Sequence, residues 1–113
     1  TGLWVKYGDG IADIMPLSGV YKTQVIKLAK YLNIPSRFIE KPPTPNLGAA
    51  IGDEQLLQIN YPKLDIILSG LEHNLTLSHI AEIAGISMEE VERVQNLINK
   101  SEWLRQPPMH LNL

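Results

Sequence analysis

Apolar side chains recur at helical spacing over most of this chain, and that periodicity constrains the fold more than any other feature. The first stripe consists of Tyr21, Val25, Leu28 and Leu32. Residues three or four positions apart share one face of a helix, so these side chains predict an amphipathic helix that ends near Asn33. Residues 37–39 are expected to add a short helical turn after it.

The second half of the chain has the same periodicity. One apolar stripe consists of Leu64, Ile67, Leu68 and Leu71, although Gly70 weakens its end. A further stripe near the C-terminus consists of Val91, Val94, Leu97 and Ile98. Each stripe predicts a helix with one buried face, so helices are expected to dominate the chain.

Capping residues mark where the last two helices should begin and end. Thr76 can accept a hydrogen bond from a free backbone N–H at the start of a short helix, which is expected to stop at Gly85. Ser87 and Glu90 form a capping box, in which each side chain satisfies a free backbone donor of the other residue. The last helix is therefore expected to begin directly after Ser87.

The first residues favour extended structure instead. Residues 3–7 are rich in β-forming side chains and run into a Gly-Asp-Gly turn, and a second extended piece is expected at residues 12–17. Two short strands cannot make a stable sheet alone, which suggests a larger sheet upstream. The predicted fold class is therefore α/β, with residues 1–113 as the mainly helical C-terminal part of one domain.

Composition and charge argue against several classes of function. The formal net charge of −2 gives no general attraction to nucleic acid or to an anionic membrane. Cysteine is absent, which excludes thiolate chemistry and fits a reducing compartment. The three histidines are isolated, so no zinc site is predicted. No apolar run approaches the roughly 20 residues that span a bilayer, so a cytoplasmic location is expected.

The most informative stretch for function is Lys-Tyr-Gly-Asp-Gly-Ile-Ala-Asp at residues 6–13. Its glycines permit a tight turn, and Lys6 and Asp13 bring opposite charges that suit a polar molecule bearing phosphate. Gly-Asp-Gly alone is more typical of a surface β-turn. Two later segments favour a ligand site instead. Tyr-Lys-Thr-Gln opens the helix at residues 21–24, and Lys-Pro-Pro-Thr begins a loop of residues 41–52 whose length suggests a role in function.

In this order and spacing, the three segments resemble the ammonia-dependent NAD synthetases, members of the N-type ATP pyrophosphatase group. The resemblance covers essentially the whole chain and implies an α/β fold of the adenine-nucleotide α-hydrolase type and a homodimer. It also implies ATP, deamido-NAD and ammonia as substrates, with Mg²⁺ as the usual metal. In such enzymes the nicotinate carboxylate is adenylated with release of pyrophosphate, and ammonia then attacks the acyl-adenylate to form the amide.

The resemblance also assigns binding roles to individual residues. It implies that Lys6 and Asp13 contact deamido-NAD, and that Lys22 and Thr44 contact ATP. A lysine in the first turn of a helix is mildly disfavoured by the helix dipole, so a phosphate partner would account for Lys22 better than a solvated surface role does. Thr44 lies between prolines, where a hydroxyl that bonds its own backbone is common. No catalytic residue and no metal ligand is assigned.

The sequence also departs from the family pattern. Its Ser-Gly-Gly-x-Asp-Ser phosphate loop does not occur among these 113 residues, and neither does the upstream region that supplies a magnesium-linked glutamate. The chain is therefore not expected to turn over by itself. Near the C-terminus the family usually reads Ser-Glu-His-Lys-Arg, whereas residues 101–105 read Ser-Glu-Trp-Leu-Arg. The role of the His-Lys pair toward deamido-NAD therefore does not carry over to Trp103 or Leu104.

Two other classes of function remain open alternatives. Residues 80–87, followed by Val91, fit a helix-turn-helix pattern. Glu89, Glu90 and Glu92 would face DNA phosphates, so packing explains the pattern better than DNA binding does. The other alternative is a non-catalytic module that keeps a dimerisation or interaction surface of the family and lacks its chemistry.

Overall fold

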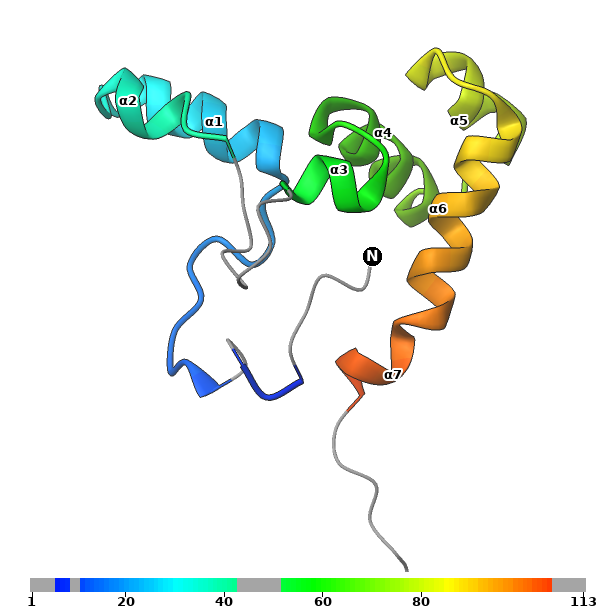
Figure 1. The fold of residues 1–113 in the computed structure, drawn as a ribbon, viewed down its shortest axis with the longest axis horizontal. Helices are drawn as coiled ribbons and strands as arrows, with labels where there is room; N and C mark the ends of the chain where they lie inside the picture. The colour runs from blue at the N-terminus through cyan, green and yellow to red at the C-terminus, as the bar shows by residue number, and fades with distance from the viewer. Residues whose placement is uncertain (1–5, 9–10, 43–51, 107–113) are drawn as a thin grey trace, which may run out of the picture.

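The computed structural model of the chain describes residues 6–8, 11–42 and 52–106. All regular elements in these ranges are helices (Figure 1). In chain order they are α1 (Lys22–Tyr31), α2 (Ser36–Ile39), α3 (Asp53–Leu57), α4 (Tyr61–Glu72), α5 (Leu77–Ala84), α6 (Met88–Lys100) and α7 (Glu102–Arg105).

The predicted strands are not found in the described part of the chain. Residues 3–5 lie outside it, and residues 6–8 form a turn and a bend. The segment 12–17 is also not a strand, because its backbone makes only local turns, such as the hydrogen bond of 3.2 Å from the N–H of Ser18 to the carbonyl of Met15. A β-forming segment needs a neighbouring strand for its ladder, and the described residues supply none. The expected strand at residues 12–17 is therefore wrong, whereas the expectation that this part of an α/β domain is mainly helical agrees with the described residues.

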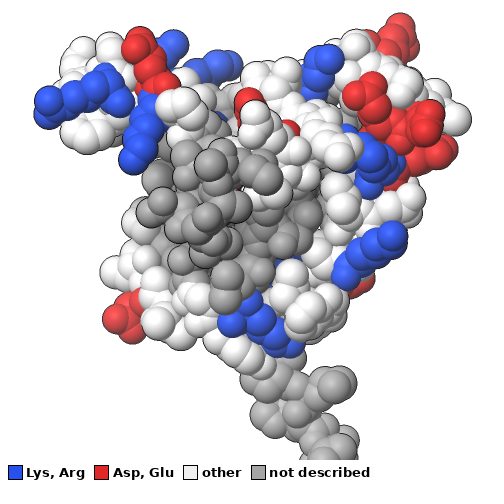
Figure 2. All heavy atoms as spheres, in the orientation of Figure 1, with Lys and Arg blue, Asp and Glu red and all other residues white. Residues whose placement is uncertain are grey.

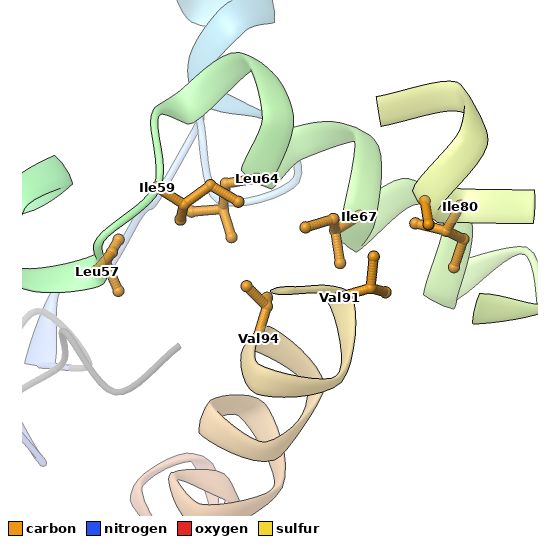
Figure 3. Close-up of a cluster of buried hydrophobic side chains, with 8 residues drawn as sticks. Leu57, Ile59, Leu64, Ile67, Ile80, Val91 and Val94 are labelled. Atoms are coloured by element: carbon orange, nitrogen blue, oxygen red, sulfur yellow. The ribbon is translucent and has the colours of Figure 1, made fainter. Parts of the chain in front are cut away.

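Helix α4 is the centre of the packed structure and contacts α1, α5 and α6. The core gathers apolar side chains from α3, α4, α5, α6 and the turn that precedes α4 (Figure 3). It consists of Leu57, Ile59, Leu64, Ile67, Ile80, Ala81, Val91 and Val94. The stripes predicted from residue 64 onward therefore do face one another.

Gly70 is a packing residue rather than a weak helix end. Helix α4 continues past it to Glu72, and Gly70 itself is buried. A Cβ atom at this position would lie 2.6 Å from the Cγ1 atom of Ile80, whose side chain is fully buried. The absence of a side chain at Gly70 thus allows α4 and α5 to approach closely.

The predicted caps of the last two helices are confirmed. The Thr76 hydroxyl accepts a hydrogen bond from the N–H of His79 at 3.4 Å, and Gly85 ends α5 in the left-handed region with φ of +62°. At the start of α6, the N–H of Glu90 donates to the Ser87 hydroxyl at 3.2 Å, and the N–H of Ser87 donates to the Glu90 carboxylate at 3.2 Å. Local sequence alone determines these helix ends.

Helices α1 and α2 pack against each other at one end of the molecule (Figure 1), and α1 also contacts α4. The predicted helix at 21–33 and the turn at 37–39 are both present. No residue of either helix is fully buried, and Leu28 and Leu32 keep 40% and 57% of their surface exposed. The apolar stripe of α1 is thus only partly covered. Within the described ranges, no helix has the length and apolar character needed to cross a membrane.

Candidate functional site

The start of α1 is fixed to α4 through a buried carboxylate. Asp65 on α4 is 7% exposed, and its Oδ2 atom accepts a hydrogen bond from the backbone N–H of Thr23 at 2.8 Å. The N–H of Tyr21 donates to the Gln24 side chain at 2.9 Å, which satisfies a second free donor. A carboxylate at a helix N-terminus also suits the helix dipole. Together these contacts fix the position of Lys22, which lies between Tyr21 and Thr23.

Lys22 itself lies near an aromatic ring on α4. Its Nζ atom is 6.0 Å from the centroid of the Tyr61 ring, and its side chain is exposed. The Tyr61 hydroxyl donates a hydrogen bond to Asp53 Oδ2 at 3.0 Å, and the Tyr61 N–H donates to Glu54 Oε1 at 2.8 Å. The first turn of α3 thereby holds the ring that Lys22 approaches.

These surroundings raise the pKa values of two tyrosines. Burial raises the pKa of Tyr61 to about 12, and the hydrogen bond to the Asp53 carboxylate adds to the effect. Tyr21 donates its hydroxyl to Glu72 Oε2, and burial followed by this hydrogen bond raises its pKa to about 12 as well. Both phenols are therefore neutral hydrogen-bond donors at neutral pH. Two phenol–carboxylate pairs thus connect the α1 and α3 region to α4.

A pocket of about 340 Å³ opens between α1, α2 and the start of α4. Lys22 and Lys41 both line it, as does the carboxylate-bearing Glu54. Most of the rest of its wall is apolar and includes Ile34 and Phe38. A concave, mainly apolar site with a few charged groups is typical of pockets that bind small molecules. Two lysines at its rim favour a ligand that carries negative charge.

A second group of side chains joins the N-terminal turn to α7. Lys6 Nζ donates a hydrogen bond to the backbone carbonyl of Trp103 at 3.1 Å and lies 5.4 Å from the centroid of the Trp103 ring. It also lies 5.5 Å from the centroid of the Tyr7 ring. A cation in this position is attracted to the faces of both rings. Lys6 is thus held by a residue that lies 97 positions further along the sequence.

The residues assigned from the sequence do not all meet in the described structure. Lys22 lines the pocket, and Lys6 belongs to the separate contact with Trp103. Asp13 is exposed, and no described residue forms a hydrogen bond or ion pair with it. Thr44 lies outside the described residues. The binding roles of these four residues stay predictions.

Several residues of this region carried no assignment from the sequence. Asp65 and Tyr61 lie four positions apart on α4 and so share the face that meets α1 and α3, a spacing that could have signalled a common site. The contacts of Asp53 and Glu72 with tyrosines depend on how separate helices pack, and no local motif indicates them.

The corner between α5 and α6 explains the helix-turn-helix pattern as packing. Ile80 of α5 and Val91 of α6 meet in the core, and Gly85 forms the turn. Acidic side chains gather over this corner of the molecule (Figure 2). Helices α5 and α6 carry the exposed Glu82 and Glu89. This surface would repel the phosphates of DNA.

Comparison with known proteins relates the chain to one family. The family model described as NAD synthase matches residues 1–108. The NH(3)-dependent NAD(+) synthetase of Thermotoga maritima is 43% identical over 105 residues, which cover 93% of this chain and 35% of the relative. The protein of the same name from Thermococcus kodakarensis is 43% identical over 110 residues, covering 96% of this chain and 43% of the relative.

A third relative matches the chain to a similar extent. The NH(3)-dependent NAD(+) synthetase of Methanocaldococcus jannaschii is 40% identical over 108 residues, covering 96% of this chain and 42% of the relative. The chain thus spans less than half the length of each of these curated relatives, while nearly all of it is matched.

Proposed function

This chain belongs to the NAD synthase family, and we propose that it forms part of a synthetase that amidates deamido-NAD with ammonia. In this reaction the nicotinate carboxylate of deamido-NAD attacks the α-phosphorus of ATP and pyrophosphate leaves. Ammonia then attacks the carbonyl carbon of the acyl-adenylate, AMP leaves, and the amide of NAD is formed. We propose further that the whole protein has the α/β fold of the family and a cytoplasmic location, and that this chain is the C-terminal part of its synthetase domain.

The pocket between α1 and α2 is proposed as the ATP site. The observation that carries this is the position of Lys22, which is fixed at the start of α1 and lines the same pocket as Lys41. Negative charge moves onto pyrophosphate as the bond to the α-phosphorus breaks, and ammonium groups beside it stabilise that charge. The apolar wall, which includes Phe38, offers a surface for the base of the nucleotide. Thr44 is proposed as a further ATP contact.

Tyr61 and its carboxylate partners have a positioning role in this proposal. The Tyr61 ring lies beside Lys22, and the phenol keeps its proton because its pKa is raised to about 12. Asp53 and Glu54 hold Tyr61 through its hydroxyl and its backbone N–H, respectively. The lysine thus has an attractive, uncharged neighbour that leaves its charge available to phosphate. Lys6 and Asp13 are proposed to contact deamido-NAD.

Mg²⁺ is the usual metal of such reactions. Across residues 6–8, 11–42 and 52–106, no three side chains of aspartate, glutamate, histidine or cysteine come together in a group that could hold a metal ion. Magnesium prefers oxygen ligands and often binds through phosphates and one or two carboxylates. These residues therefore do not form a metal site by themselves, and no role in the proposal depends on one.

Calorimetric titration of ATP into the natural gene product that contains this sequence tests the ATP site. Lys22→Met is expected to weaken binding roughly tenfold, because a charged hydrogen bond to phosphate is lost. Lys30→Met is the matched control, since Lys30 is an exposed lysine of the same helix that does not line the pocket. Equal affinity of Lys22→Met and wild type for ATP would refute the assignment.

The exposed apolar side chains of α1 and α2 favour the alternative of an assembly module. Tyr31, Leu32, Ile34 and Phe38 keep 81%, 57%, 42% and 61% of their surface exposed. Contiguous exposed apolar surface is often covered in an assembly, and a second copy of the chain is proposed to cover it. Sedimentation equilibrium should then show a dimer that Leu32→Glu dissociates. A wild-type chain that stays monomeric at all concentrations would count against it.

A further inference from the structure

We propose that Trp103 is a positioning residue for Lys6, which it directs toward an anionic group of the dinucleotide. The inference rests on the proposed function in one respect, the identity of the ligand as deamido-NAD. The contact between the two residues is independent of that identity. Lys6 meets Trp103 in two ways, through the backbone carbonyl at 3.1 Å and through the ring, whose centroid is 5.4 Å away.

The hydrogen-bonding capacity of Lys6 leaves room for a ligand. An ammonium group has three N–H donors, and the carbonyl of Trp103 takes one of them. The rings of Trp103 and Tyr7 attract the charge through their faces and accept no conventional hydrogen bond. Among the described residues no other acceptor takes the two remaining donors, which can meet anionic oxygens while the long lysine side chain is held in one place. A side chain that is ordered before binding loses less entropy when the ligand arrives.

Both partners are held by the surrounding backbone. Tyr7 lies in the left-handed region with φ of +64°, which is uncommon for a bulky residue and fixes the turn that carries Lys6. On the other side, Arg105 donates hydrogen bonds to the Ser101 hydroxyl at 3.1 Å and to the carbonyl of Ile98 at 2.8 Å. These bonds connect α7, and with it Trp103, to the end of α6.

The exposure of the Trp103 side chain leaves room for a ligand to reach the Lys6 ammonium that the ring holds. It keeps 61% of its surface exposed even though one face meets the lysine. The Lys6 cation attracts a negatively charged group, and the neighbouring exposed indole favours an aromatic ring. A ligand that combines the two therefore fits this place. The nicotinate group of deamido-NAD, a pyridine ring with a carboxylate, has this chemistry. Trp103 is thus placed to orient Lys6 and to exclude water from one side of its charge.

Substitutions at position 103 separate the ring from the carbonyl, because every substitution keeps the backbone carbonyl. Trp103→Leu retains apolar bulk and removes the aromatic face, whereas Trp103→Phe retains a face. The first measurement is the NMR signal of the Lys6 ε-methylene group in the full chain, which the ring current of Trp103 should displace. Lys6→Met identifies the signal. We expect Trp103→Leu to move the Lys6 signal toward the chemical shift of the other lysines, and Trp103→Phe to retain part of the displacement.

The second measurement is the affinity for deamido-NAD, by calorimetric titration, of the natural gene product that contains this sequence and carries the same substitutions. Loss of an exposed cation–π contact should weaken binding about twofold to fivefold in Trp103→Leu and less in Trp103→Phe. In a Lys6→Met background, Trp103→Leu should have no further effect, because the residue it positions is gone. Met88→Ala, which removes another exposed apolar side chain, should leave binding unchanged and serves as the control.

The outcomes separate this inference from the proposed function. An unchanged Lys6 signal in Trp103→Leu would overturn the inference, and so would unchanged affinity in a chain that binds deamido-NAD. An equal loss of affinity with and without Lys6 would also overturn it, since Trp103 would then act alone. If the natural gene product that contains this sequence binds no deamido-NAD but the Lys6 signal moves as expected, the proposed ligand is wrong and the contact between Trp103 and Lys6 is upheld.

Discussion

The carboxylate of Asp65 on α4 accepts a hydrogen bond at 2.8 Å from the backbone N–H of Thr23 in the first turn of α1. This bond joins residues that are 42 positions apart, and the carboxylate that makes it is 7% exposed. It fixes the end of α1 that carries Lys22. The geometry of the proposed ATP site thus depends on a residue of α4 that does not line its pocket.

Removal of this carboxylate should lower both stability and ATP binding. Asp65→Ala leaves the N–H of Thr23 without its acceptor and is expected to lower the free energy of unfolding by about 2 kcal/mol, measured by urea denaturation. Asp65→Asn keeps an acceptor and should cost less. ATP affinity should fall in the same order. A stable Asp65→Ala variant with wild-type affinity for ATP would show that α1 is fixed by other contacts.

The hydroxyl of Tyr61 should make stability depend on pH in alkaline solution. Its pKa rises from 10.0 to about 12 on folding, so the folded state holds the proton more tightly than the unfolded state. The stabilisation is therefore complete below pH 10 and is lost as pH rises toward 12. Tyr61→Phe should be less stable than wild type at neutral pH, with a difference that shrinks across this range. Urea denaturation at several pH values checks this, and a constant difference would contradict it.

A side chain at Gly70 should push α4 and α5 apart. Gly70→Ala places a Cβ atom 2.6 Å from Ile80 Cγ1 and 2.9 Å from its Cδ1 atom. The gain in helix propensity is about 1 kcal/mol, whereas overpacking of a core costs about 1–3 kcal/mol. We expect a net loss of stability in thermal unfolding. The loss should be smaller in an Ile80→Val background, where the Cδ1 contact is absent, and an equal loss in both backgrounds would argue against this contact.

The hydrogen bonds of Arg105 should keep α7 in place. Its guanidinium donates to the Ser101 hydroxyl and to the carbonyl of Ile98, at the C-terminal end of α6. Arg105→Met is expected to lower the protection of the α7 amides in hydrogen exchange, because the short helix loses its main attachment. Lys100→Met, which removes an exposed cation nearby, should leave that protection unchanged. Equal protection in Arg105→Met and wild type would contradict this role.

Local signals in the sequence predicted the helix boundaries in the C-terminal half well. Thr76, Ser87 and Glu90 act on backbone groups three residues away, and Gly85 needs only its own conformational freedom. Such contacts are the same in any fold, so the sequence alone reveals them. Asn60 caps α4 through the N–H of Lys63 at 3.1 Å in the same way and could have been identified too.

Contacts between distant segments could not be predicted in this way. Whether the apolar face of α1 is covered depends on what packs against it, and the exposure of Leu28 and Leu32 shows that the described residues cover it only in part. The expected strand at residues 12–17 is wrong for the same reason, because a strand forms only beside a neighbouring strand. Lys6 contacts Trp103, and Thr23 contacts Asp65. Neither pair could be identified without the folded structure.

NAD synthesis by the natural gene product that contains this sequence is the most direct measurement of the central claim. It is supplied with deamido-NAD, ATP, magnesium and ammonia, and NAD and AMP are both quantified. The account predicts equal amounts of the two products, a strong loss of rate in Lys22→Met, and little change in Lys30→Met. Absence of NAD, or a Lys22→Met variant as active as wild type, would contradict it.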